Sequence, residues 1–408
     1  MNTLKRSFVF VLLCGPALVA VEAWAQAASD QSVTSDLAVT YQINARHTGA
    51  TLISGLRPPL KIKWSVDLGA TVSYPLIANG KVYVLAGCDG AGKVNLYALN
   101  GLTGAIDWGP IEILEGAYCW AAAAYDHGMV FVVPDSSSPF GSSGAMFAFD
   151  ANDGHQIWSV LLSGQYLFSS PPTALNGIVY TGGAGVGGTV YAVRESDGTA
   201  LWTGSVENGD SSSPVVTSST VFVSYVCPQT YAFNAASGQQ IWHYSGSCEG
   251  GGGNTSVLYA GSLYVRDVDA IPNSGLALDA VTGTVTSSFS SLFAPAFRGK
   301  TAFYTQSNTL AAVNILTGAT VWTSAPRTGD SYTSAPIVVN DFVYIGTASG
   351  HLLGYEAATG KHVLSINVGA PISAYDGFTF GASPTAGLGA GQGLLVVPAS
   401  TRVVALSQ

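Results

Sequence analysis

A short hairpin pattern recurs along this 408-residue chain and constrains its fold more than any other feature. The first copy, residues 96–108, reads LYALNGLTGAIDW: an apolar run, a turn that ends in Gly, and a Trp four residues after that Gly. Short β-prone runs on both sides of a turn whose Gly can adopt a positive φ predict a β-hairpin. Further copies at residues 146–158, 190–202 and 230–242 predict a repeat protein.

The turn glycines mark the period of the repeat. Neighbouring markers are 35 to 50 residues apart, which suits the four-stranded blade of a β-propeller. The markers are Gly104, Gly154, Gly198, Gly238, Gly283, Gly318 and Gly360.

The two ends of the repeat region complement each other. Residues 61–68 (KIKWSVDL) resemble the Trp-bearing fourth strand of a blade but have no hairpin partner before them, whereas residues 383–406 supply three strands and then stop. Pairing the two ends closes the ring and removes an open sheet edge. The sequence therefore predicts an all-β, eight-bladed propeller of four-stranded antiparallel blades. Its fourth strands are expected around Trp64, Trp108, Trp158, Trp202, Trp242, Phe289, Trp322 and Leu364.

The repeated tryptophans are interpreted as packing groups between neighbouring blades. A spacing shared by most blades favours a structural role over a cofactor role, and the fifth blade has Ser287 at this spacing instead. The blade-docking residues are predicted to be Trp64, Trp108, Trp158, Trp202, Trp242 and Trp322.

The first 25 residues are predicted to be a secretory signal peptide. Lys5 and Arg6 precede an apolar run that is too short and too interrupted for the roughly 20 residues of a spanning helix, and residues 23–25 (AWA) fit a cleavage site. We expect residues 26–55 to be a tail and lead-in segment, with a structural role for His47, and residues 56–408 to form one propeller. The protein is then periplasmic or extracellular, with no membrane span.

Charge excludes one class of partner. Charged residues make up 10% of the chain and the net charge is −9, which does not suit nucleic acid.

The hairpin pattern, together with Ser-Pro before several first strands, resembles the PQQ-like β-propeller repeat over about residues 40–408. The resemblance implies either a quinoprotein dehydrogenase that holds pyrroloquinoline quinone and calcium, or a cofactor-free propeller like the outer-membrane assembly lipoprotein. Dehydrogenases of this type have a disulfide between adjacent cysteines beside the quinone. They also have a Glu and an Asn that bind calcium, and an Asp that acts as the general base. No two cysteines are adjacent here, and no calcium ligand or base can be matched, so we expect no cofactor.

Four cysteines remain after export, and four can pair in three ways. Cys88 and Cys227 each end a second strand, and Cys119 and Cys248 each lie in the connection that leaves the same blade. This parallel favours a Cys88–Cys119 and a Cys227–Cys248 disulfide. A metal site is the alternative, although exported cysteines are more often oxidised.

Both pairs would lie on the face that carries the second-to-third-strand loops and the blade-to-blade connections, here called the loop-rich face. Aromatic rings and carboxylates there could hold a sugar, a peptide or a cationic ligand. Turn chemistry is the simpler reading for the two Asp residues that follow Gly. The candidate binding residues are Trp120, Tyr166, Phe168, Asp210, Asp330, Tyr332, Tyr375 and Asp376.

We therefore expect a non-catalytic binding or scaffold module with a protein or glycan partner on the loop-rich face. A quinone-dependent oxidoreductase is the alternative, and a polysaccharide-binding or polysaccharide-cleaving propeller is a third option.

Overall fold

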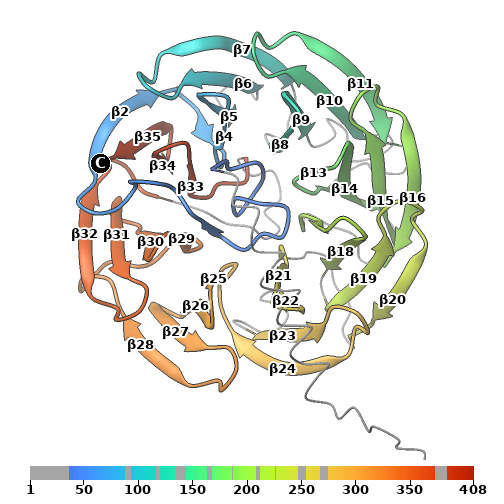
Figure 1. Cartoon of the computed structure of the whole chain (residues 1–408). Helices are drawn as coiled ribbons and strands as arrows, with labels where there is room; N and C mark the ends of the chain where they lie inside the picture. Colours follow the sequence, from blue (N-terminus) through green and yellow to red (C-terminus); the bar gives the residue numbers. More distant parts are fainter. Residues whose placement is uncertain are drawn as a thin grey trace, which may run out of the picture. The chain divides into compact units, whose positions relative to one another are not determined.

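The computed structural model describes residues 36–87, 93–115, 120–134, 144–162, 168–185, 187–207, 212–225, 227–246, 254–266, 274–372 and 384–408. The described residues form strands and turns only, without a helix. Eight separate antiparallel sheets follow one another around a ring (Figure 1), so the predicted eight-bladed propeller is confirmed. The predicted signal peptide and the first part of the tail lie outside the described residues.

In the first half of the ring each blade runs from an innermost strand to an outermost one. Blade 1 contains β3 (Thr71–Val72), β4 (Leu76–Ala78), β5 (Lys81–Gly87), β6 (Lys93–Asn100) and β7 (Ile106–Glu115). Blade 2 contains β8 (Ala121–Asp126), β9 (Met129–Pro134), β10 (Gly144–Asp150) and β11 (Gln156–Leu162). Blade 3 contains β12 (Phe168–Ser169), β13 (Thr173–Leu175), β14 (Ile178–Gly185), β15 (Gly187–Arg194) and β16 (Ala200–Val206). Blade 4 contains β17 (Val215–Val216), β18 (Thr220–Tyr225), β19 (Gln229–Asn234) and β20 (Gln240–Tyr244).

The second half repeats this order until the last blade. Blade 5 contains β21 (Val257–Tyr259), β22 (Ser262–Arg266), β23 (Ser274–Asp279) and β24 (Val285–Ser290). Blade 6 contains β25 (Ala296–Arg298), β26 (Thr301–Gln306), β27 (Thr309–Asn314) and β28 (Thr320–Ser324). Blade 7 contains β29 (Ile337–Val339), β30 (Phe342–Gly346), β31 (His351–Glu356) and β32 (His362–Asn367). Blade 8 contains β33 (Gly389–Gly391), β34 (Leu394–Ala399), β35 (Arg402–Ser407) and, as its outermost strand, β2 (Lys61–Asp67).

The closure of the ring is as predicted. Strand β2, from near the start of the propeller, pairs antiparallel with the C-terminal strand β35, with Trp64 opposite Ala405. Because β2 completes blade 8, the last blade of the ring has its full set of four strands.

The tight turns of each blade lie together at one end, here called the turn face. In blade 1 the turn between the first two strands contacts the turn between the last two, since Gly101 N donates to Gly80 O over 2.8 Å. The equivalent bond in blade 4 runs from Ala235 N to Ser219 O over 2.9 Å. The loop-rich face is at the opposite end, because antiparallel strands place alternate connections at alternate ends.

The six repeated tryptophans contact the next blade around the ring. Each indole Nε1 donates to a backbone carbonyl on the turn face of that blade, over 2.7 to 3.2 Å. The acceptors are Gly101, Ala151, Glu195, Ala235, Ala280 and Ala357. The turn glycine of the neighbouring blade lies very close to the indole: a Cβ on Gly238 would be 2.6 Å from the Trp202 side chain.

The lead-in segment, residues 36–55, lies inside the ring, where Figure 1 shows it in dark blue. Its short strand β1 (Ala50–Thr51) runs parallel to β29 of blade 7. The rest of the segment makes hydrogen bonds to each of the other blades in turn. The pairs, from blade 8 through blades 1 to 6, are Asp36–Gln392, Ala38–Ile77, Val39–Tyr125, Thr40–Pro172, Ala45–Val216, Arg46–Leu258 and Thr48–Phe297.

Candidate functional site

The predicted binding residue Trp120 is a packing group in this structure. Its ring is buried, and its Nε1 donates to Thr385 Oγ1 over 3.0 Å, which joins the start of blade 2 to the approach to blade 8. The ring therefore offers little surface to a ligand in this conformation, and a role in binding stays a prediction.

Asp330 and Tyr332 organise the connection between blades 6 and 7. Asp330 accepts hydrogen bonds from Ser331 N and Ser349 N, and its backbone oxygen accepts one from Asn308 Nδ2. Tyr332 is buried, and its hydroxyl lies 2.8 Å from that of Tyr355. These contacts are typical of a turn residue, and a role in binding for Asp330 and Tyr332 stays a prediction.

The other predicted binding residues cannot be placed. Tyr166, Asp210, Tyr375 and Asp376 lie outside the described residues, and only the backbone of Phe168 is described, in β12. Among the cysteines of the two predicted disulfides, Cys88, Cys119 and Cys248 also lie outside the described residues, whereas Cys227 is described and fully buried. Both pairings stay predictions.

His47 holds the lead-in segment against the inner wall of the ring. The side chain is fully buried, with Nδ1 at 2.8 Å from Tyr41 O and Nε2 at 2.9 Å from Pro214 O. Burial lowers the pKa of His47 to about 4, although the two carbonyl contacts favour the charged ring. The residue is enclosed by backbone on both sides, which fits the structural role expected for it.

Serine hydroxyls on the loop-rich side of the inner strands are already engaged. Ser73, Ser170, Ser291 and Ser334 each accept a hydrogen bond from a backbone N–H of the second strand in the same blade. Because the same contact recurs in four blades, these buried hydroxyls belong to the repeat.

The described inner strands do not fit calcium and quinone. Calcium takes oxygen ligands and usually several carboxylates. The described inner strands of the eight blades contain one carboxylate, Asp126, and it ends β8 on the turn face. No adjacent cysteines occur anywhere in the chain. We therefore derive no catalytic step through this cofactor.

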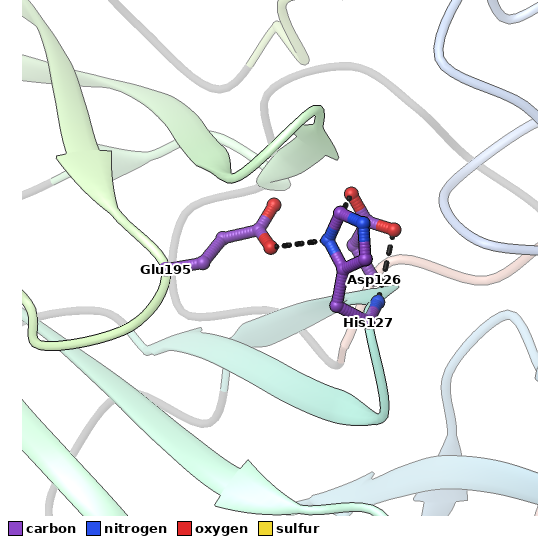
Figure 2. A group of neighbouring side chains, drawn as sticks. All are labelled: Asp126, His127 and Glu195. Carbon is purple, nitrogen blue, oxygen red and sulfur yellow. Dashed lines mark hydrogen bonds and ion pairs between the residues drawn. The ribbon is translucent and has the colours of Figure 1, made fainter.

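A compact group of titratable side chains lies on the turn face instead. Asp126 ends β8 of blade 2, His127 lies in the turn that follows, and Glu195 follows β15 of blade 3 (Figure 2). His127 Nδ1 is 2.9 Å from Glu195 Oε2 and 3.3 Å from Asp126 Oδ2. One ligand atom from each residue can be chosen so that all three lie within 4.8 Å of one another.

Burial of Glu195 shapes the electrostatics of this group. Its side chain is 3% exposed whereas that of His127 is 62% exposed, so the imidazole faces solvent and the carboxylate does not. Burial raises the pKa of Glu195 to about 7, against the opposing hydrogen bond from His127. The same hydrogen bond, together with the charge of Asp126, raises the pKa of His127.

The sequence reasoning missed this group, although a signal was present. Aligned on the hairpin repeat, the position after the third strand is Gly101, Ala151, Ala235, Ala280 or Ala357 in five other blades. Glu195 is the acidic residue at this position. An acidic residue at a position that is glycine or alanine in five other blades and Ile315 in blade 6 could have marked the site.

The fold defines the class of protein, an eight-bladed β-propeller, and the repeats resemble those of the PQQ-like type. Residues 186–378 match the family model described as "Outer membrane protein assembly factor BamB", which confirms the resemblance predicted from the hairpins. No curated protein matches the chain in sequence.

Solved structures show the same fold at low sequence identity. The quinohemoprotein alcohol dehydrogenase of Comamonas testosteroni has 13% identity and a TM-score of 0.70, and the match covers 95% of this chain and 84% of that one. BamB from Moraxella catarrhalis has 15% identity and a TM-score of 0.61, with 86% and 100% covered. A europium-containing methanol dehydrogenase has 13% identity and a TM-score of 0.66, with 85% and 88% covered. Because these structures include enzymes and an assembly factor, the fold does not choose between the two functions.

Within the part of the chain that the structure describes, no helix is long and apolar enough to span a membrane.

Proposed function

We propose that the chain is an exported, non-catalytic propeller that binds a protein partner through its loop-rich face. The observation that carries this proposal is the composition of the inner wall of the ring. Its described strands contain one carboxylate, at the end opposite the loop-rich face, and the hydroxyls of four of its serines already accept the backbone hydrogen bonds that recur from blade to blade. The family match over residues 186–378, to an assembly factor by description, supports a protein as the partner.

Blade-to-blade connections are the proposed contact region. Tyr166, Asp210, Tyr375 and Asp376 lie in these connections and would supply rings and carboxylates to the partner, as would Phe168. The predicted signal peptide at residues 1–25 would deliver the protein to the periplasm or beyond it.

Photo-crosslinking in cells tests which face is used. A photoreactive amino acid at Leu161, which is 71% exposed at the loop-rich end of β11, should give adducts of discrete mass. The matched position is Val281, 79% exposed in a tight turn of the opposite face, and it should give none. Adducts at Val281 alone, or equally at both positions, would contradict the proposed face.

The competing functions need a separate measurement on the purified protein. Titration with pyrroloquinoline quinone in the presence of calcium should leave the quinone unbound and a redox dye unreduced when alcohols are supplied. Tight quinone binding with dye reduction would replace the scaffold function by an oxidoreductase. Specific binding on a glycan array would instead identify a carbohydrate as the partner.

A further inference from the structure

Glu195 departs from the repeat at a position where its backbone is firmly held. Trp158 Nε1 donates to Glu195 O over 2.7 Å, and Glu195 N donates to Gly177 O over 3.0 Å. The equivalent residue is glycine or alanine in five other blades and Ile315 in blade 6, so none of these six blades places a charged side chain here. The repeated contacts at this position use only the backbone of Glu195, so its carboxylate is not required by the repeat.

One oxygen of this carboxylate lacks a partner. Glu195 Oε2 contacts His127, but Oε1 is buried and finds no hydrogen-bond donor among the described residues. An unsatisfied buried oxygen on a charged group is costly. A bound cation would satisfy it.

We propose that Glu195, His127 and Asp126 bind one divalent first-row transition-metal ion, with zinc as the representative. An imidazole nitrogen and two carboxylate oxygens are ligands typical of such ions, whereas calcium and magnesium prefer oxygen alone. The three side chains converge in Figure 2, and the exposed ring of His127 leaves the site open to solvent for entry of the ion and for a bound water.

The ion would join two blades. Asp126 and His127 belong to blade 2 and Glu195 belongs to blade 3, so coordination would link the turns of neighbouring blades where a hydrogen bond links them now. On binding, the ion would displace the proton between His127 Nδ1 and Glu195 Oε2 and would be held by both oxygens of Glu195, so that Oε1 gains its partner. This site is separate from the loop-rich face, and the proposal does not depend on the proposed function.

A second group of similar composition provides the control. Asp150, Asp153 and His155 share one exposed turn of blade 2, and the structure gives them no buried oxygen without a partner. His155 Nδ1 is 2.7 Å from Asp153 Oδ1, a contact like that between His127 and Glu195 but in open solvent. The control therefore has the same ligand types without the burial.

Calorimetric titration of the metal-free full chain with zinc chloride tests the site. One ion should bind per chain and raise the thermal midpoint by a few degrees. Glu195→Gln keeps the size of the side chain but removes a charged metal ligand. Loss of a residue that only orients a metal ligand already weakens metal binding about tenfold or more, so the affinity for zinc should fall at least about tenfold. His155→Gln should bind zinc like the unaltered protein.

Cobalt gives an independent reading. Co²⁺ added to the metal-free chain should produce visible absorption bands that zinc displaces, and His127→Gln, which alters an exposed ring, should abolish them even if Glu195→Gln fails to fold. The proposal is overturned if the unaltered chain binds no ion, if Glu195→Gln binds zinc with unchanged affinity, or if His155→Gln removes the binding.

Discussion

The junction between blades 3 and 4 and the junction between blades 5 and 6 solve the same packing problem differently. In the first, Trp202 lies over the turn at Gly238 and donates to Ala235 O over 2.8 Å. In the second, Ser287 takes the position of the Trp, and the space beside Gly318 contains no atom within 4 Å of where a Cβ would be.

An aromatic cluster replaces the Trp at the second junction. Phe289, two residues after Ser287, stacks on Tyr304 of blade 6 with ring centroids 5.1 Å apart and meets Tyr264 edge-on at 5.5 Å. The turn glycine nevertheless keeps the same φ of 70° at Gly238 and Gly318. The glycine therefore serves the turn itself, and its closeness to an indole is a second, separable role.

Removal of the indole should have the largest effect. Trp202→Ala should lower the free energy of unfolding by about 3 kcal/mol or more, since large-to-small changes of packed aromatic residues cost about 3–5 kcal/mol. The midpoint of urea unfolding, compared with that of Ser287→Ala, measures the difference. An unchanged midpoint in Trp202→Ala would show that the indole does not dock the blades.

A matched pair of glycine substitutions separates the two roles of the turn residue. Gly318→Ala should cost about 1–2 kcal/mol, the strain of an alanine in left-handed backbone. Gly238→Ala should cost about 1–3 kcal/mol more, because its Cβ would overlap the Trp202 ring. Equal thermal midpoints for the two variants would mean that the indole moves aside freely.

Installing the missing indole should have the smallest effect. The residue opposite the Trp is alanine in six blades, and Ala277 keeps that space opposite Ser287. Ser287→Trp should therefore raise the free energy of unfolding by about 0.5–2 kcal/mol, as cavity-filling changes do. A lowered unfolding midpoint would show that Phe289 and its neighbours already fill the junction.

The propeller could be predicted from the sequence because each blade repeats the same local physics. Turn glycines, strand patterns and the unpaired strand around Trp64 each carry their information within a few residues, so the number of blades and the closure of the ring follow from them. The partners in contacts that do not repeat were beyond this reasoning, even where one residue, such as Glu195, departs visibly from the repeat. Glu195 and His127 are 68 residues apart and look like ordinary turn residues until the blades are placed side by side.

Aromatic residues in connections were ambiguous for a different reason. A ring that follows a polar loop suits a binding surface and a packing contact equally well. The choice depends on neighbours such as Thr385 beside Trp120 and Tyr355 beside Tyr332, which are distant in sequence from the rings they cover.

The lead-in segment has a consequence for the order of folding. Its residues bond to every blade, and the bond between Asp36 and Gln392 spans 356 positions of the chain. Contacts between such distant residues form slowly, because a long loop must close first. The N-terminal part of the propeller must therefore wait for blade 8 before its contacts are complete. Such a chain cannot complete its fold until the strands of blade 8 are in place.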